Sequence, residues 1–301
     1  MKITVILTLY NSEKIVLKTI HSILSQDGIG KLFDLELLVV DDCSSDRTRS
    51  LLDQANITYL TTPFNSGGPN RGRNMGLRLA TGDYITIVDH DDEWKPCRIK
   101  ALLPYLDKAP IITSGFVTKY LDNGKEYEVV ASKNTDHLMF PENATFIQKL
   151  TKTNRGQNTY LGSIVFHNSL KNIFFEEHFG VVDFDWILRL FHKQPSLEIS
   201  QVLYTRYVDK INLSRNENYR RKDFFYSLYT LDGYKNQYPK AHRTGYRRLH
   251  GSRARYFYVN KQMEEARFYL MRSEFSWKSI GYFLTSFLGS SWITNKYRVF
   301  E

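Results

Sequence analysis

A short run near residue 90 places three carboxylates within four residues, Asp89-His90-Asp91-Asp92. Carboxylates this close repel one another at neutral pH unless a cation or water screens them. Their oxygens are hard ligands suited to Mg²⁺ or Mn²⁺, ions that keep positions open for substrate phosphates. An ion bridging a diphosphate would neutralise charge on a leaving group. A solvated acidic turn is the alternative interpretation of the run alone.

Two further polar clusters follow predicted strands, at residues 8–11 and at Asp41-Asp42. Ligands of open α/β sheets bind beyond the carboxyl ends of the strands, so the three clusters are expected to converge on one edge. Arg71 and Arg73 lie in a glycine-rich loop predicted over residues 65–74, and we expect them to reach the same phosphates. Because the three clusters are expected to converge on one edge, a functional site is a better interpretation of the acidic run than a solvated turn.

Alternating strands and helices are predicted to position these clusters. Continuous apolar runs indicate buried parallel strands over residues 3–9, 35–42, 57–62 and 84–89. Helical spacing favours helices over 11–25, with Asn11 or Ser12 as N-cap, over 46–54, and from the glycine-rich loop to Ala80. This β-α-β-α-β-α-β order predicts an open parallel sheet with right-handed crossovers.

The remaining chain is expected to add strands and then helices. Asp122-Asn123-Gly124 predicts a hairpin between strands 111–120 and 125–132. A strand over 161–167 and a helix over 182–192 follow, and the pattern is helical from about residue 219. We therefore predict an α/β catalytic domain over 1–214, with halves 1–105 and 106–214, and a helical region over 215–301.

Composition argues against a membrane-spanning protein, and the positive charge is concentrated in one part of the chain. The 301 residues are 42% hydrophobic, and no stretch approaches the roughly 20 apolar residues of a transmembrane helix. Two cysteines without metal-site spacing indicate a reducing, cytoplasmic setting. The net charge of +9 lies in residues 215–301, which hold 17 Lys and Arg against 7 Asp and Glu. This basic, aromatic tail suits a polyanion or an anionic membrane surface, or is a solvated helical face.

Five motifs in fixed order resemble those of the inverting family 2 glycosyltransferases of the GT-A fold, over roughly the first 215 residues. The strand-end motifs are Thr8-Leu9-Tyr10-Asn11 and Val40-Asp41-Asp42-Cys43-Ser44-Ser45-Asp46. The glycine-containing motifs are Asn65-Ser66-Gly67 with Arg73-Asn74-Met75-Gly76. The last two are Ala80–Ile85 with Asp89–Pro96, and Phe175-Glu176-Glu177 with Asp183-Phe184-Asp185 through Arg189-Leu190.

The resemblance implies a fold and a role for each matched residue. The fold is GT-A, a Rossmann-like, mostly parallel sheet flanked by helices, here with a C-terminal helical extension. Asp91 is implied as the ligand of Mn²⁺ or Mg²⁺, and Asp183 as the general base that deprotonates an acceptor hydroxyl. The implied donor contacts are Thr8, Tyr10 and Asp42 at the nucleoside, Arg73 nearby, Asp89 at the ribose and sugar, and His90 beside them.

Four departures from the family pattern bear on these roles. Thr8 replaces a common proline, Gly72 replaces an alanine and predicts a looser loop, and Val182 replaces the acidic residue before the base. The segment from Tyr204 to Val208 resembles a Tyr-x-Arg-x-His motif without its histidine. His90 or water is then left to complete the metal's shell.

The expected function is inverting transfer of a sugar from a nucleotide-sugar donor to a glycan or lipid-linked oligosaccharide in cell-surface polysaccharide synthesis. The site of action is expected to be the cytoplasm, with the amphipathic stretch 277–288 docking on the inner membrane face. A sugar nucleotidyltransferase is one alternative, but it would need a glycine-rich loop directly after the first strand. A non-catalytic lipid- or RNA-binding module is the other, and no nucleic-acid motif supports an RNA partner.

Overall fold

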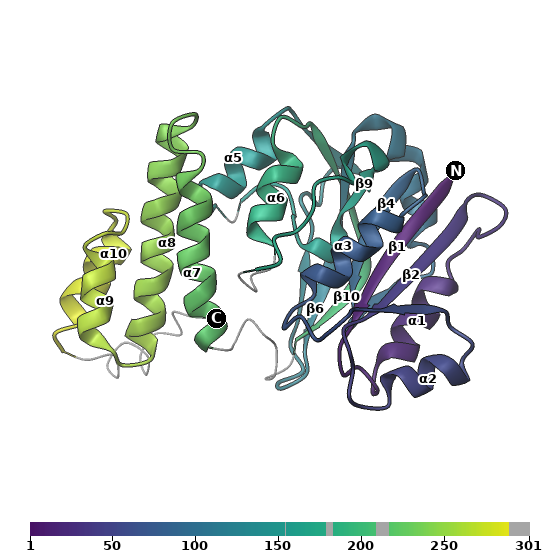
Figure 1. Cartoon of the computed structure of the whole chain (residues 1–301). Helices are drawn as coiled ribbons and strands as arrows, with labels where there is room; N and C mark the ends of the chain where they lie inside the picture. The colour runs from purple at the N-terminus through teal and green to yellow at the C-terminus, as the bar shows by residue number, and fades with distance from the viewer. Residues whose placement is uncertain (154, 179–182, 209–216, 289–301) are drawn as a thin grey trace. The chain divides into compact units, whose positions relative to one another are not determined.

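The computed structural model describes residues 1–153, 155–178, 183–208 and 217–288. The chain forms two compact units, one from Met1–Phe146 and Gly156–Lys222, the other from Ile147–Arg155 and Asp223–Glu301 (Figure 1). The first unit contains the sheet, and the second is helical.

A mixed sheet organises the first unit. Its strands lie in the order β3-β2-β1-β4-β9-β6-β10-β5, with β7 paired to β6 and β8 to β10. Strands β1 to β4 are parallel, as predicted, whereas β9 runs antiparallel to both β4 and β6. The strands are β1 Lys2–Leu9, β2 Asp34–Asp41, β3 Tyr59–Thr61, β4 Tyr84–Asp89, β5 Asp92–Trp94, β6 Ile111–Tyr120, β7 Glu126–Val129, β8 His137–Phe140, β9 Val165–His167 and β10 Ser196–Val208.

Strand β1 is mostly apolar because helices cover both of its faces. Ile3, Val5, Leu7 and Leu9 pack in one core cluster with α1. On the opposite face Gly76 of α3 lies so close to Ile6 that a methyl group there would collide with it. The sheet edge at the carboxyl ends of β1, β2 and β4 is left for ligands.

Helices α1, α2, α3, α4 and α6 belong to the first unit, together with three short 3₁₀ segments. Their bounds are α1 Val16–Leu24, α2 Thr48–Gln54, α3 Asn70–Leu79, α4 Arg98–Leu102 and α6 Phe184–Phe191; helix α5 is Ala144–Leu150. The 3₁₀ segments are Leu103–Lys108, Leu161–Ser163 and Asn168–Leu170. The predicted strand over 161–167 is therefore wrong in its first half, and β5, β8, the long β10 and α5 were not predicted.

Two local predictions near the strand ends were wrong. Helix α1 begins at Val16, because Asn11 has a left-handed φ of 47° and uses its Oδ1 to accept from the Ser45 amide, 2.9 Å away. The glycine-rich loop ends at Pro69, since α3 already begins at Asn70. Gly72 is therefore helical, and a Cβ there would lie 3.0 Å from Thr8 Cγ2, so its small size permits close packing and does not loosen a loop.

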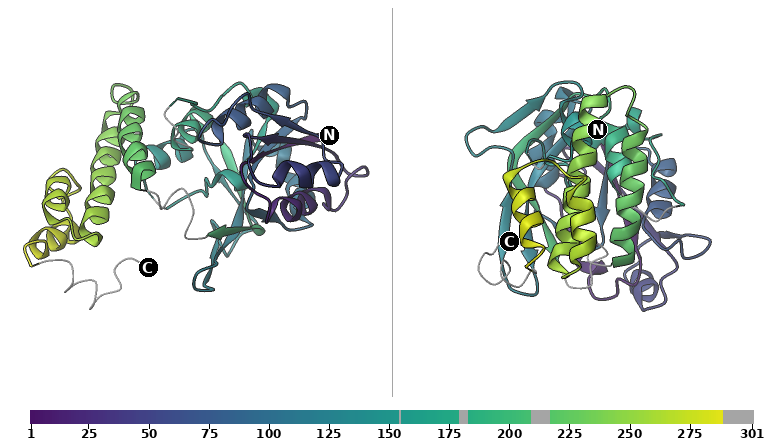
Figure 2. Two further views of the ribbon diagram at one scale, coloured as in Figure 1. Left: turned by 60° about the horizontal axis from the view of Figure 1, so that its bottom comes forward. Right: turned by 90° about the vertical axis from the view of Figure 1, so that its left-hand side faces the viewer.

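The second unit consists largely of four consecutive helices, α7 Glu217–Asp232, α8 Pro239–Val259, α9 Met263–Leu270 and α10 Trp277–Thr285. In both figures α8 lies between α7 and the α9–α10 pair (Figures 1 and 2). Tyr258 of α8 is completely buried and donates a hydrogen bond to Thr285 of α10. Over the residues described, the chain contains no helix with the length and apolar character needed to cross a bilayer.

Candidate active site

The guanidinium of Arg73 joins two carboxylates that are far apart in the sequence. Its Nη2 lies 2.7 Å from Asp89 Oδ1, at the end of β4, and its Nη1 lies 3.0 Å from Asp183 Oδ1, just before α6. The arginine side chain is only 2% exposed, whereas those of Asp89 and Asp183 are 27% and 32% exposed. The two acids are therefore oriented by a buried fork while remaining accessible from solvent.

Helix α3 brings Arg73 to this position by binding the segment around Phe175. The side-chain amide of Asn74 donates to Phe175 O and Glu177 Oε1, and its Oδ1 accepts from Phe175 N. Asn70 also donates to Glu176 O, 2.7 Å away. These two asparagines are polar yet buried, because the segment around Phe175 satisfies their hydrogen bonds.

The electrostatics of the fork keep Arg73 charged. Burial by itself lowers the pKa of its guanidinium, but the charges of Asp183 and Asp89 outweigh burial and hold that pKa above its usual range. Asp183 is oriented by this fork and partly exposed, and a carboxylate placed in this way has the geometry of a general base.

Tyr160 and Arg206 approach the acidic run from other elements. The Tyr160 hydroxyl lies 3.4 Å from Asp89 Oδ2, and its ring stacks on Phe116 and Tyr204. Arg206 of β10 lies over the Tyr160 ring, 4.5 Å from the centroid. Arg206 is also in register with Asp92 of β5, so β10 supplies positive charge to the run.

The other two carboxylates of the run differ in burial. Burial, then the charge of Asp89, raises the pKa of Asp91. Asp92 is 1% exposed, and burial followed by the charges of Asp89 and Asp91 raises its pKa well above the usual range. Asp89 and Asp91 are only partly buried whereas Asp92 is enclosed, a difference that the motif alone did not show.

The Asp42 carboxylate fastens the glycine-rich loop to the end of β2. It accepts hydrogen bonds from Thr62 Oγ1 at 2.7 Å, from Ser66 Oγ at 2.9 Å and from the Ser66 amide. Tyr10, one strand away, is 47% exposed. Thr8 is buried and in register with Asp89, which connects this region to the acidic run through β1.

Arg71 does not lie in the loop where we predicted it. It is in the first turn of α3, where its Nε is 3.3 Å from Glu177 Oε2 and its guanidinium lies over the Phe64 ring. His90 is placed by its backbone, whose carbonyl accepts from Thr19 Oγ1 at 2.7 Å.

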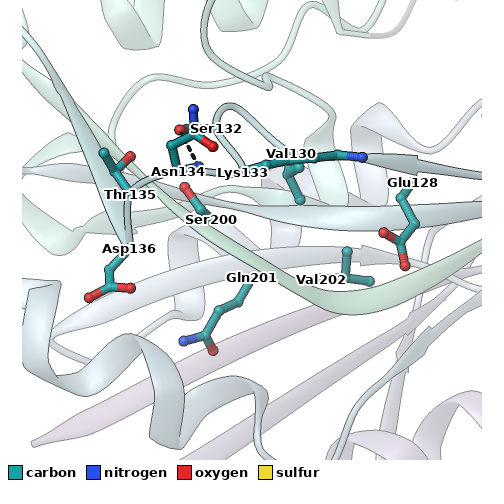
Figure 3. Close-up of a pocket in the computed structure, with 10 residues that line it drawn as sticks. All are labelled: Glu128, Val130, Ser132, Lys133, Asn134, Thr135, Asp136, Ser200, Gln201 and Val202. Atoms are coloured by element: carbon teal, nitrogen blue, oxygen red, sulfur yellow. Dashed lines mark hydrogen bonds between the residues drawn. The ribbon is translucent and has the colours of Figure 1, made fainter.

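A separate pocket of the first unit has a volume of about 710 Å³. It is formed by β10 and by the chain between β7 and β8, and Figure 3 shows the side chains around it. None of the predicted site residues lines this pocket, so the candidate active site remains the cluster around Arg73. Its lining residues are Glu128, Val130, Ser132, Lys133, Asn134, Thr135, Asp136, Ser200, Gln201 and Val202.

Comparison with known proteins decides the family. The model of glycosyl transferase family 2 matches residues 4–174, more than half of the chain. The chain belongs to glycosyl transferase family 2. The family assignment agrees with the GT-A motifs and with the α/β sheet described above.

Curated proteins with similar sequences are named as glycosyltransferases of colanic acid biosynthesis and of poly(ribitol phosphate). The putative colanic acid biosynthesis glycosyl transferase WcaA of Escherichia coli K12 is 32% identical over 137 residues, 43% of this chain and 47% of WcaA. The poly(ribitol-phosphate) β-N-acetylglucosaminyltransferase TarS of Staphylococcus aureus is 35% identical over 112 residues, 36% of this chain and 19% of TarS. The chain thus matches less than half of the length of either relative.

A solved family 2 structure shares the fold. The crystal structure of S. aureus TarS residues 1–349 in complex with UDP-GlcNAc superimposes with a TM-score of 0.66 and 21% sequence identity, covering 95% of this chain and 81% of that one. At this identity the likeness concerns the fold alone.

The donor set fits a divalent metal of the kind that family 2 motifs imply. Asp89 and Asp91 bring two carboxylates close enough for one to raise the pKa of the other, and a cation would relieve that repulsion. Within the described ranges no group of three or more His, Cys, Asp or Glu side chains is arranged to hold a metal. Mg²⁺ and Mn²⁺ do not require one, because waters and substrate phosphates complete their shells.

Family 2 motifs did not indicate every residue of the cluster. Tyr160 has no motif around it, and its ring stacks on Phe116 and Tyr204 with its hydroxyl near Asp89. Arg206 lies in the Tyr-x-Arg segment, a signal that points to it. The missing histidine of that segment corresponds to Val208, which is buried at the end of β10.

Proposed function

We propose that this protein is an inverting, metal-dependent glycosyltransferase that moves a sugar from a nucleoside diphosphate to a hydroxyl group of a glycan acceptor. The observation that supports this most strongly is the Arg73 fork between Asp89 and Asp183. It holds an acid of the donor half and an acid of the acceptor half in one site, as transfer between two substrates requires.

Asp183 acts as the general base of the reaction. As the acceptor hydroxyl oxygen bonds to the anomeric carbon, its proton passes to the Asp183 carboxylate, and the bond from that carbon to the β-phosphate oxygen breaks. Attack comes from the face opposite the leaving group, so the anomeric configuration inverts. Arg73 positions the base and keeps it ionised until the proton arrives.

Asp91, with Asp89 beside it, would hold Mn²⁺ or Mg²⁺. When bound, the ion neutralises charge that develops on the leaving diphosphate. Asp89 also faces the ribose and the sugar, and His90 lies next to both acids in the chain. Thr8, Tyr10 and Asp42 bind the nucleoside: Tyr10 offers an exposed ring, and Asp42 fixes the loop that contains Ser66.

The acceptor is a surface polysaccharide or its lipid-linked precursor, and the enzyme works at the cytoplasmic face of the membrane. The named roles of similar proteins in colanic acid and poly(ribitol phosphate) synthesis support this acceptor class. A campylobacter relative, 38% identical over 97 residues, is named for a lipid-linked acceptor, GalNAc(5)-diNAcBac-PP-undecaprenol. The basic charge of residues 215–301 supports the membrane location.

Thermal unfolding with nucleotides tests the donor site. UDP, GDP and dTDP are each added with Mn²⁺ and with EDTA, because a ligand that binds the folded state raises the melting temperature. We expect one nucleotide to stabilise the protein in Mn²⁺ and much less in EDTA. No shift with any nucleotide, or an equal shift in EDTA, would contradict the metal-dependent donor site.

A further inference from the structure

The helical unit contains a basic pocket of about 490 Å³. Five of its lining residues are cationic, namely Lys152, Arg247, Arg248, Arg255 and Lys278. Two are acidic, Asp223 and Glu274, and serine and threonine side chains complete much of the wall. The excess of cations and hydroxyl donors gives the pocket the chemistry of an anion site.

The cations of the pocket are only partly neutralised. Arg248 Nε lies 2.7 Å from Glu274 Oε1, and its Nη1 donates to a backbone carbonyl. Within the part of the chain that the structure describes, Arg247, Arg255 and Lys278 form no ion pair. Burial lowers the pKa of Lys152 to about 7, and an anion nearby would favour its charged form.

Two exposed aromatic residues adjoin this pocket along the chain, and we call them its rim. Ser276 lines the pocket, and its chain neighbours Phe275 and Trp277 are 90% and 89% exposed. Two rings this exposed cost solvation free energy unless a partner covers them. Trp and Phe at the edge of a basic surface are typical of proteins that lie on a bilayer.

Helix α10 continues this apolar rim on one face. Trp277 and Leu284 of α10, and Leu288 in the turn after it, repeat at helical spacing and are 89%, 62% and 77% exposed. The opposite side is covered, since Tyr282 and the C-cap residue Ser286 are 4% and 2% exposed. The helix therefore presents its apolar side outward from the unit, the reverse of a helix that serves only the core.

We propose that this pocket binds the phosphate of an anionic phospholipid head group while Phe275, Trp277 and the outer face of α10 enter the bilayer interface. The proposal deepens the membrane location given above and does not depend on sugar transfer. A soluble phosphate would use the cations but leave the aromatic rim uncovered, so charge and apolar surface together favour a lipid. The helix would lie in the plane of the interface, with its apolar side toward the acyl chains.

Co-sedimentation of the full chain with vesicles tests the proposal. Vesicles of phosphatidylglycerol and of phosphatidylcholine are compared at low salt. The pocket variant is Arg247→Gln/Arg255→Gln/Lys278→Gln, and its control is Lys235→Gln/Lys240→Gln/Arg243→Gln, which removes equal charge from exposed positions outside the pocket. The rim variant is Phe275→Ser/Trp277→Ser, and its control is Phe225→Ser/Tyr229→Ser on α7, where both rings are also exposed.

We expect wild-type protein to sediment with phosphatidylglycerol and not with phosphatidylcholine. Each cation near an anionic surface contributes about fivefold to binding, so the pocket variant should bind roughly a hundredfold more weakly. The rim variant should also lose at least about tenfold, and both controls should bind as wild type does. All variants should retain transfer to a soluble acceptor, so failure of transfer and failure of lipid binding are distinguished.

Four results would overturn the proposal. The first is wild-type protein that stays in solution with phosphatidylglycerol at low salt. The second is a pocket variant that binds like its control, which indicates diffuse electrostatic attraction. The third is a thermal shift with glycerol phosphate but no vesicle binding, which assigns the pocket to a soluble anion. The fourth is a dimer in sedimentation velocity that the rim variant dissociates, which shows that a second copy covers the rim.

Discussion

Replacing Arg73 tests whether the buried fork organises the two catalytic halves. Arg73→Met removes the charge from between Asp89 and Asp183, and Arg73→Lys keeps the charge but offers one ammonium in place of two nitrogens. Arg78→Lys, at an exposed position of the same helix, is the matched control.

The structure sets the size of the effect. Breaking a buried ion pair by removing one partner costs about 3–5 kcal/mol, but Asp89 and Asp183 are 27% and 32% exposed and regain water. We therefore expect Arg73→Met to lower the free energy of unfolding by about 2–3 kcal/mol and Arg73→Lys by about 1–2 kcal/mol. Loss of base positioning should lower kcat about a hundredfold in Arg73→Lys.

The pH dependence of the rate adds a readout that destabilisation alone does not change. Removing a cation that favours the Asp183 carboxylate lets that carboxylate bind a proton more easily. The acid limb of the kcat profile of Arg73→Met should therefore move to higher pH. Urea unfolding and a coupled nucleotide-release assay measure these effects. Wild-type stability, kcat and acid limb in Arg73→Lys would refute the reasoning.

Three further predictions concern the surrounding contacts. Asn74→Leu leaves the Phe175 amide and carbonyl without their buried partner, so urea unfolding should show a loss of about 2–4 kcal/mol; unchanged stability would mean that α3 does not hold this segment. Tyr160→Phe keeps the ring stack but removes the hydroxyl near Asp89, so kcat should fall less than about tenfold while the melting temperature stays the same. A larger loss of kcat would mean that Tyr160 takes a direct part in the chemistry. Burial raises the pKa of Glu198 to about 7, so the folded state holds a proton that the unfolded state releases, and stability should fall by up to about 3 kcal/mol as pH rises from 4.5 to 7. Glu198→Gln should remove this pH dependence of stability, as denaturation at several pH values will show. A pH dependence that persists in the variant would come from other groups.

The half of the fold that parallel strands build was predictable because each strand is a separate apolar run. Residues such as Ile3, Val5 and Leu7 are buried on a strand with both faces covered, and that burial is visible in one short window of sequence. The acidic run was likewise predictable, because Asp89 ends one of those strands. Its position on the ligand-binding edge follows from the direction of the sheet.

Features that depend on contacts between distant segments were not predictable in the same way. β10 alternates polar and apolar residues irregularly, since a register shift between Ile199 and Val202 interrupts its pairing with β6. The burial of Arg73 depends on Asp89 and Asp183, 16 and 110 residues away. The sequence motif that contains Arg73 could be recognised, but it does not predict that the guanidinium is buried.

The central claim is that Asp91 serves the donor and its metal whereas Asp183 serves the acceptor. Isothermal titration in Mn²⁺ tests it most directly, with whichever nucleoside diphosphate stabilises the wild-type protein. Asp91→Asn should lose binding by at least about tenfold, because a hard cation prefers a carboxylate to an amide. Asp183→Asn should bind the nucleotide as wild type does and lose turnover by about a hundredfold or more. Wild-type nucleotide binding in Asp91→Asn, or wild-type turnover in Asp183→Asn, would contradict the account.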